Sequence, residues 1–385
     1  MTNPIGPLTP TDEDLCHQIA DTFAVVGSTD LSWTEKVCAS AFAKDGSLQL
    51  GFGLGKYNNR NVMDAYAGVS RGVEQTTVRA SRSLDDDPLT TVIGPIRYEV
   101  VEPLKTIRFV LEPNDVQPIS FDWLFEAVLP PQFEDRTHIR AGYRVSAELV
   151  RYHQTGRCSG WIDIDGERVE MTPETWVSTR DHSWGVRYGV GADRTDLEPA
   201  VEDPNGSYHF FWTPSLLERP AGAPYGVFMV MNHFRRTGID AKSTWGMFEH
   251  PDGSVERMID IVPELAYDPV NRRLRGGRVH CTMADGSTRT LQVEVVSDTG
   301  FHLGTGLYFG FDGHHHGEWR GQLHVEGERI DDCSTPEAAR RVHQIRDTVV
   351  RITDPAGGGV GYGNWQPIAS GSLPELGLDA ATSFM

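Results

Sequence analysis

The stretch STRDHSWGVRYG at residues 178–189 is the densest group of chemically capable side chains in this sequence. An acid, an imidazole, an indole and two guanidinium groups fall within eight of its residues. If the stretch is a β-strand, its period of two directs His182 and Trp184 to one side and Asp181 to the other. An imidazole titrates near neutrality, and an indole face stabilises a developing positive charge. The pair suits proton-initiated chemistry on alkenes or allylic alcohols; the alternative is a structural histidine and aromatic residue at a barrel rim.

A second aromatic segment, SYHFFW, follows at residues 207–212. The same alternation predicts that Tyr208, Phe210 and Trp212 share one face of a strand. His209 and Phe211 then occupy the opposite face. The segment therefore offers a second aromatic wall.

Glu249 ends a third segment, TWGMFEH, in which Trp245, Met247 and Glu249 alternate onto one face. A carboxyl buried among apolar groups has a raised pKa and can serve as a general acid. The alternative, which the Pro-Asp-Gly turn at 251–253 slightly favours, is a solvated glutamate.

Three consecutive histidines at 314–316 raise the question of a metal site. Consecutive residues point in different directions and rarely converge on one ion, so exposed loop histidines are favoured after the turn at 312–313. The glycine-rich segments at 51–56 and 357–365 lack the context of a phosphate-binding loop. We predict neither a metal nor a cofactor.

Short strands separated by turns dominate the sequence, and Asp-Gly pairs at 252–253, 285–286 and 312–313 are typical of hairpins. Helical periodicity is scarce, and the best candidates are 11–23, with Thr11 as N-cap, and 335–349. Many strands with few helices predict an all-β protein.

The composition excludes several classes of protein. A formal net charge of −19 argues against nucleic acid or an anionic membrane surface as a partner. No apolar run approaches the length of a membrane span, and the N-terminus lacks the features of a signal peptide. The five cysteines are odd in number and widely separated, so a disulfide framework is not expected. We expect a cytoplasmic protein and leave open whether it forms a homo-oligomer.

An internal similarity predicts two related halves. At a fixed offset of 161 residues, five positions agree without a gap: Gly156, Gly160, Gly166, Glu167 and Arg168 match Gly317, Gly321, Gly327, Glu328 and Arg329. Downstream, Arg180-Asp181 has a counterpart in Arg346-Asp347, which suggests a scaffold role such as an ion pair closing each barrel. His182 and Trp184 have no counterpart. Coincidence among β-turns is the alternative to duplication.

The acidic, aperiodic segment 190–206 has the composition of a linker between these halves. We therefore predict two tandem antiparallel β-barrels, an N-terminal one over residues 1–195 and a C-terminal one over residues 196–385.

The order of these features resembles the double-lipocalin superfamily, which includes carotenoid 1,2-hydratases, AttH-like proteins and lipocalin-like Diels–Alderases. The resemblance rests on RDHSWGVR at 180–187, followed by the aromatic strand YHFFW. It implies two lipocalin-like barrels with an apolar ligand pocket in or between them. In the hydratases, His-x-Trp and a later Tyr-x-Asp are implicated in protonating an isoprenoid double bond. His182-Ser183-Trp184 matches the first motif; Tyr208 matches the tyrosine, but Phe210 stands at the aspartate position.

Together, the residues and the resemblance predict a cofactor-independent enzyme that acts by proton transfer on a hydrophobic, isoprenoid-like, terpenoid or polycyclic molecule. The reaction would be hydration, dehydration, isomerisation or cyclisation, with His182 assisted by Asp181. A carrier or sensor of a hydrophobic ligand is the alternative. The expected catalytic residues are Asp181, His182, Trp184, Tyr208 and His209, and the expected substrate-binding residues are Trp123, Tyr152, Arg187, Phe211, Trp212, Trp245 and Glu249.

Overall fold

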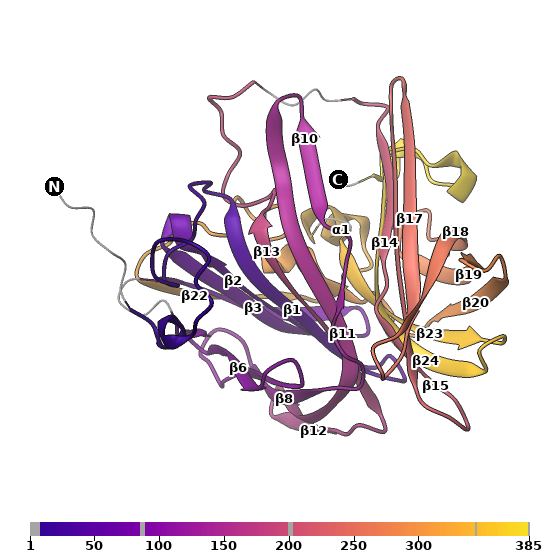
Figure 1. Cartoon of the computed structure of the whole chain (residues 1–385), viewed down its shortest axis with the longest axis horizontal. Helices are drawn as coiled ribbons and strands as arrows, with labels where there is room; N and C mark the ends of the chain where they lie inside the picture. The colour runs from indigo at the N-terminus through magenta and orange to yellow at the C-terminus, as the bar shows by residue number, and fades with distance from the viewer. Residues whose placement is uncertain (1–7, 85–88, 199–202, 343–344, 384–385) are drawn as a thin grey trace.

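The computed structural model describes residues 8–84, 89–198, 203–342 and 345–383. Figure 1 shows two groups of β-strands side by side, with the earlier part of the chain at the left and the later part at the right. Each group is one antiparallel sheet that curves into a barrel, as the sequence predicts. Helices are short and lie outside the barrels.

The first sheet has fourteen strands, and thirteen of them follow one another between residues 33 and 186. The path through it is β22-β4-β3-β2-β1-β13-β11-β8-β7-β6-β5, and β9, β10 and β12 also pair with the long β11. The strands are β1 (Trp33–Ala43), β2 (Gln49–Tyr57), β3 (Val62–Arg71), β4 (Glu74–Ser83), β5 (Val92–Ile93), β6 (Ile96–Glu102), β7 (Thr106–Leu111), β8 (Ile119–Ala127), β9 (Gln132–Phe133), β10 (Thr137–Ala141), β11 (Arg144–Ile164), β12 (Glu167–Met171), β13 (Trp176–Val186) and β22 (Leu323–Ile330).

The second sheet has ten strands and closes on itself, because β14 and β15 both pair with β16 on one side and β24 on the other. Closure removes the free edges that an open sheet would leave. The strands are β14 (Ser207–Trp212), β15 (Ser215–Glu218), β16 (Tyr225–Arg236), β17 (Ile239–Glu249), β18 (Val255–Tyr267), β19 (Leu274–Met283), β20 (Thr288–Val295), β21 (Phe301–His302), β23 (Arg346–Asp354) and β24 (Gly359–Ser370).

Both predicted helices are shorter than expected. Residues 11–23 contain only the end of a single 3-10 turn, η1 (Pro10–Glu13), which begins after Thr9 rather than Thr11. The segment 335–349 forms α1 (Pro336–Val342) and then enters β23, because the β-branched run from Thr348 onward pairs with β20 and β24. The other 3-10 turns are η2 (Asn58–Arg60), η3 (Leu303–Gly306), η4 (Pro374–Leu376) and η5 (Ala380–Thr382).

Strand β22 crosses from the second half of the sequence into the first sheet, where it pairs with β4 (Figure 1). This placement contradicts the predicted internal repeat. Gly166 and Glu167 turn the β11–β12 hairpin, whereas their supposed partners Gly327 and Glu328 lie inside β22 of the same sheet. The agreement at offset 161 therefore does not mark equivalent strands, and the first sheet draws on both halves of the chain.

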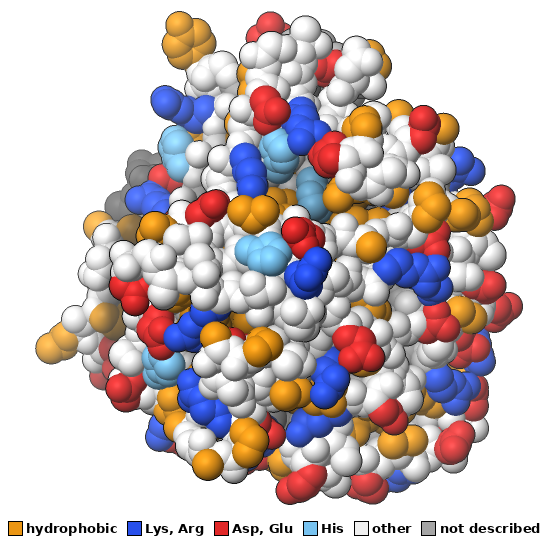
Figure 2. Space-filling model, turned by 90° about the vertical axis from the view of Figure 1, so that its right-hand side faces the viewer, with side chains coloured by type: hydrophobic (Ala, Val, Ile, Leu, Met, Phe, Trp, Pro, Cys, Tyr) orange, Lys and Arg blue, Asp and Glu red, His pale blue; other side chains and the backbone are white. Residues whose placement is uncertain are grey.

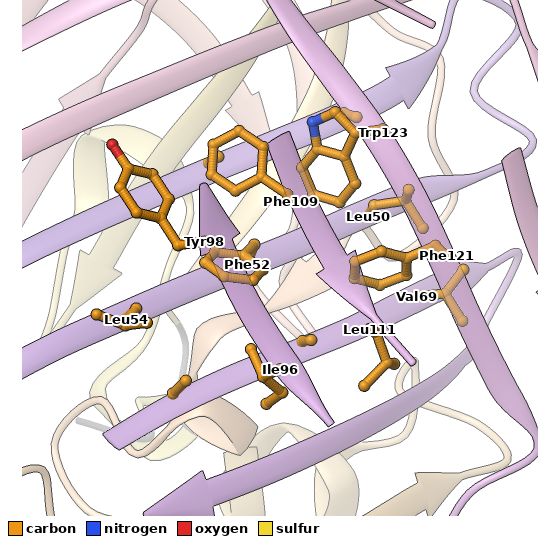
Figure 3. Packing of buried hydrophobic residues seen from close by; sticks show 14 of the residues in the cluster. Leu50, Phe52, Leu54, Val69, Ile96, Tyr98, Phe109, Leu111, Phe121 and Trp123 are labelled. Carbon is orange, nitrogen blue, oxygen red and sulfur yellow. The ribbon is translucent and has the colours of Figure 1, made fainter. Parts of the chain in front are cut away.

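The interior of the first barrel is filled with aromatic and branched side chains (Figure 3). Phe109 stacks on Trp123 at a centroid distance of 4.8 Å, and Phe52 meets Phe109 edge to face at 5.0 Å. The predicted alternation in 120–130 holds, since Phe121, Trp123 and Phe125 all lie in this core. The second barrel has its own filled core, around the fully buried Trp365.

Glycines on the outer face of β2 allow neighbouring aromatic rings to pack closely. A Cβ atom at Gly51 would lie 2.5 Å from the ring of Phe301, and one at Gly53 would meet the ring of Tyr66. The GFGLG segment is therefore part of a strand whose glycines allow close packing, rather than a loop that leads into a helix.

The surface agrees with the composition. Figure 2, which views the side of the second barrel, shows charged side chains of both signs scattered among small hydrophobic groups. None of the helices in the described residues has the length and apolar content that a membrane-spanning helix requires.

Candidate active site between the two barrels

A cavity of about 60 Å³ lies between the outer faces of the two sheets. That volume accommodates a few water molecules or one polar functional group. Strands β1, β3, β11 and β13 contribute one wall, and β14, β23 and β24 contribute the other. The lining residues are Cys38, Ala39, Ser40, Tyr66, Arg151, Thr179, Arg180, Asp181, Arg187, Trp212, Leu303, Tyr308, Asp347, Asn364 and Gln366.

Asp347, on β23, brings a buried carboxyl group to the second-barrel wall. Its side chain accepts a hydrogen bond from Gln366 Nε2 at 3.1 Å and forms no ion pair with the described residues. Burial, together with the nearby Asp181, raises the pKa of Asp347 to about 6. A carboxyl group with this pKa holds a proton in an appreciable fraction of molecules near neutrality.

Asp181, on β13, brings a second carboxyl group to the facing wall. Burial raises its pKa, while the guanidinium groups of Arg151 and Arg187 oppose that shift. Arg151 Nε lies 3.8 Å from Asp181 Oδ1 and has no hydrogen-bond partner among the described residues. The two carboxyl groups thus differ in surroundings, since Asp181 has guanidinium neighbours whereas Asp347 has amide donors.

A buried chain of alternating charges leads from Asp181 to Glu249, on the outer face of the second barrel. Arg151 donates to Glu134 at 3.3 Å, and Trp212 Nε1 donates to the same carboxylate at 2.8 Å. His153 lies 3.7 Å from Glu134 and 2.5 Å from Glu249, with its ring stacked on Phe228. Although burial opposes the shift, Glu249 and Glu134 raise the pKa of His153 to about 9, so it carries a positive charge.

A second polar group supports the cavity wall at Tyr308. The Tyr308 hydroxyl lies 3.0 Å from Cys38 Sγ, and Lys36 Nζ lies 4.0 Å above the tyrosine ring. Lys36 Nζ donates to His316 Nε2 at 2.8 Å, and His316 Nδ1 faces Asp64 at 3.4 Å. Burial lowers the pKa of Lys36 to about 8 and that of His316 to about 4. His316 is therefore a buried neutral histidine, which corrects the expectation that all three histidines of 314–316 are exposed.

Three of the predicted site residues come together at this cavity: Asp181, Arg187 and Trp212. Arg187 donates to Ser183 Oγ at 2.5 Å and neighbours Asp181, as expected for a residue that supports its charge. Arg180 points into the first barrel, between Phe125 and Tyr152, so it does not form the predicted closing ion pair with Asp181.

His182 and Trp184 lie on the opposite face of β13, as the alternation predicts. This separation contradicts the prediction that Asp181 assists His182. The His182 Nε2 atom instead donates to Glu35 at 2.9 Å, and its Nδ1 atom accepts from the Tyr152 hydroxyl at 3.1 Å. The group lies at the mouth of the first barrel.

The residues of β14 divide between two environments. Tyr208 faces outward and donates to Asn232 at 2.9 Å, whereas Trp212 reaches the cavity. His209 and Phe211 point into the second barrel, where His209 contacts the Tyr267 hydroxyl at 2.9 Å. Burial lowers the pKa of His209 to about 4, and neither residue lines the cavity.

The remaining predicted residues have structural surroundings. Trp123 is fully buried in the first core, and Trp245 packs beside Phe228 with a centroid distance of 5.1 Å. Glu249 is 1% exposed, so the solvated alternative that the sequence slightly favoured is wrong. Its carboxylate is paired with His153 rather than placed on the cavity.

Sequence reasoning misses several cavity residues, including Arg151, Tyr308 and Cys38, because each lies in a segment without a recognisable motif. Asp347 stands out in the sequence only as the counterpart of Asp181. The two aspartates do line the same cavity, although the internal repeat that paired them is contradicted by the strand order. The described residues contain no group of three or more His, Cys, Asp and Glu side chains that could hold a metal ion.

The chain is similar in structure to several solved proteins, each at low sequence identity. A protein from Nitrosomonas europaea, named as a candidate AttH, matches with a TM-score of 0.50 and 13% identity, covering 87% of this chain and 91% of that one. Kievitone hydratase from Nectria haematococca has a TM-score of 0.43 and 10% identity, covering 90% and 93% of the two chains. CghA with Sch210972 has a TM-score of 0.47 and 11% identity, covering 88% of each chain.

The likeness to the first of these structures confirms the predicted double-lipocalin fold, with two lipocalin-like barrels in tandem. No curated protein matches this sequence. A family model does match, over residues 8–364, and its description is "Family of unknown function (DUF8625)". Because that match covers most of the chain, the protein belongs to this family of unknown function, DUF8625.

Proposed function

We propose that this protein is an enzyme that transfers a proton to a small molecule held between the two barrels, with Asp347 as the proton donor. The observation that carries the proposal is the buried Asp347 carboxyl group, whose pKa is raised to about 6, on the wall of a cavity that it shares with Asp181. A general acid works best when its pKa lies near the working pH.

The surroundings of the two carboxyl groups assign their roles. Burial and the nearby charge of Asp181 favour the neutral form of Asp347 although the amides of Asn364 and Gln366 oppose that shift, so it can give a proton. Asp181 lies beside Arg151 and Arg187, which favour its ionised form, so it can receive one. The geometry therefore supports an acid and a base on opposite walls. Such a pair suits hydration, dehydration, isomerisation or cyclisation, in which one proton enters and another leaves.

The cavity limits which part of a substrate enters it. A volume of about 60 Å³ is too small for a terpenoid or polycyclic skeleton, and guanidinium and amide groups share its lining. A hydroxyl or carbonyl group can be held there by Arg187 or Gln366, while Trp212 and Tyr66 contact the adjoining carbon atoms. We infer a substrate with a polar, reactive end on a hydrophobic skeleton.

A ligand carrier needs an interior space large enough for its cargo. Aromatic side chains fill the interior of the first barrel (Figure 3), and the second barrel is packed around Trp365. The proton-transfer enzyme is therefore the function that we favour over the carrier.

Incubation in D₂O with a panel of candidate substrates tests this function. Terpenoid alkenols, ketones and polycyclic phenols are each incubated with the protein, and mass spectrometry detects deuterium gain, added water or lost water. Asp347→Asn should abolish any conversion, and Asp240→Asn, which changes an exposed aspartate beside His233, serves as the matched control. Conversion that survives Asp347→Asn contradicts the assignment of the acid.

A further inference from the structure

The mouth of the first barrel carries a group of aromatic side chains that the proposed proton transfer does not use. Phe133 pairs with Tyr152 across β9 and β11, and Tyr152 pairs with His182 across β11 and β13. Directly paired residues of antiparallel strands share a face, and Trp184 lies two residues beyond His182 on that face. Four ring-bearing side chains from three strands therefore meet at one opening.

The three aromatic rings stand steeply to one another. Phe133 and Tyr152 have centroids 6.2 Å apart and an interplanar angle of 86°, and Phe133 and Trp184 are 6.5 Å apart at 79°. Tyr152 and Trp184 are 6.4 Å apart at 66°. Rings at these angles surround a space on several sides, whereas stacked rings lie parallel to one another. A ligand above them can lie within about 6 Å of every centroid, the range over which a cation is attracted to a ring.

A carboxylate completes the arrangement. Glu35 on β1 is paired in register with Trp184, so it lies on the same face of the sheet. Its carboxylate accepts a hydrogen bond from His182 Nε2 at 2.9 Å, and this bond lowers the pKa of Glu35. His182 in turn accepts a hydrogen bond from the Tyr152 hydroxyl, which orients the imidazole. The oriented imidazole then holds the Glu35 carboxylate in its charged form by hydrogen bonding to it.

The opening is accessible to a ligand. Phe133 is 64% exposed, and Trp184 and Tyr152 are half-buried. The net charge of −19 further favours the approach of a positive ligand over a negative one.

We propose that Phe133, Tyr152, Trp184 and Glu35 form a binding site for a small methylated ammonium compound. The aromatic faces attract a diffuse positive charge that cannot donate hydrogen bonds, and Glu35 supplies the opposite charge. A neutral molecule of the same shape gains the apolar contact but not the electrostatic attraction. The site lies on the face of β13 opposite Asp181. Choline binding can therefore be tested independently of the proposed proton transfer.

Isothermal titration calorimetry of the full-length protein with choline tests the site. The same titration with 3,3-dimethyl-1-butanol, the neutral carbon isostere of choline, gives the affinity for comparison. We expect choline to bind at least about tenfold more tightly than the isostere. Glu35→Gln and Trp184→Leu should each weaken choline binding by about tenfold or more. Trp319→Leu, which alters an exposed tryptophan outside this group, should leave it unchanged.

Thermal melts establish that each variant is folded, and Trp184→Phe, which keeps an aromatic ring, should retain part of the affinity if Trp184→Leu unfolds. Equal affinity for choline and its isostere overturns the proposal. So does an absence of choline binding at millimolar concentrations, or an affinity for choline that is unchanged in Glu35→Gln or in a folded Trp184→Leu variant.

Discussion

Asp181 and His182 are neighbours in sequence but belong to different sites, because the strand that carries them directs their side chains to opposite faces. Asp181 faces the second barrel and lines the cavity with Asp347, whereas His182 faces the mouth of the first barrel and donates to Glu35. A mechanism that couples these two neighbours would require one of them to reach through the sheet. The carboxyl group that faces Asp181 comes instead from β23, 166 residues later in the sequence.

The first prediction compares Asp347 with His182. If Asp347 is the general acid, Asp347→Asn should lower turnover by about 10²- to 10⁴-fold, the usual contribution of general acid catalysis. His182→Gln should cost less than about tenfold, because His182 lies on the far side of β13. Steady-state rates on any substrate found by the D₂O screen provide the measurement. A larger loss of turnover in His182→Gln than in Asp347→Asn would instead assign the catalytic role to the His-x-Trp pair.

The second prediction concerns pH. A general acid acts in its protonated form, and the pKa of Asp347 is raised to about 6. The rate should therefore be highest below about pH 6 and fall about tenfold per pH unit well above it. The pH profile of kcat/KM between pH 5 and pH 9 reports the pKa of the controlling group in the free enzyme. A rate that rises across this range would identify a base as the controlling group.

The third prediction is that Asp347→Asn stabilises the protein while it inactivates it. The folded-state pKa of Asp347 is raised, so the unfolded chain ionises first and stability is lost as pH rises from about 4 through about 6. An amide does not ionise, so it avoids the cost of burying a charged carboxylate. We therefore expect the free energy of unfolding to increase by about 1 to 3 kcal/mol at pH 7. Urea denaturation at pH 4 and pH 7 tests this, with Asp240→Asn as control. An equal effect at both pH values would point to packing instead.

The fourth prediction concerns the buried pair of His153 and Glu249. The raised pKa of His153 contributes stability that is fully present below about pH 6.5 and is lost as pH rises through about 9. Glu249→Gln leaves the imidazolium without its closest carboxylate and should cost about 3 to 5 kcal/mol at pH 6.5. The variant should also show a smaller decrease in the free energy of unfolding between pH 6.5 and pH 9.5.

The surface pair of His250 and Glu256, 2.8 Å apart, provides a matched control for that experiment. Glu256→Gln should change the free energy of unfolding by less than about 1 kcal/mol, because an exposed pair is screened by solvent. Similar losses for both variants would show that burial does not distinguish the two pairs.

The fifth prediction tests the proposed division at residues 195 and 196. A fragment of residues 1–198 lacks β22, which leaves β4 as an unpaired edge, and lacks Phe301, which covers Gly51 of β2. We expect this fragment to aggregate alone and to fold when it is expressed with residues 199–385. Circular dichroism and size-exclusion chromatography provide the measurements. A cooperative thermal melt of the first fragment alone would establish an independent domain.

Much of the fold is determined by local pattern. Alternation assigned Phe121, Trp123 and Phe125 to one face, and it separated Asp181 from His182, because the side-chain period of a strand is a property of the backbone. Turn residues and the scarcity of helical periodicity predicted an all-β protein, whereas the prediction of two barrels rested on the internal similarity, the linker composition and the resemblance to the double-lipocalin superfamily. The helix predicted over 11–23 is absent except for the end of the 3-10 turn Pro10–Glu13, and the helix predicted over 335–349 ends at Val342, because pairing of β23 overrode local propensity beyond it.

The candidate site is decided by tertiary structure. Arg151 and Asp347 belong to different barrels, and no local signal shows that their side chains reach one cavity. The burial that raises the pKa of Asp347 and charges His153 exists only when the two sheets exclude water from their interface. The sequence by itself determined which faces its strands present, whereas the packing of the barrels decided which faces meet, because that contact joins residues far apart in the chain.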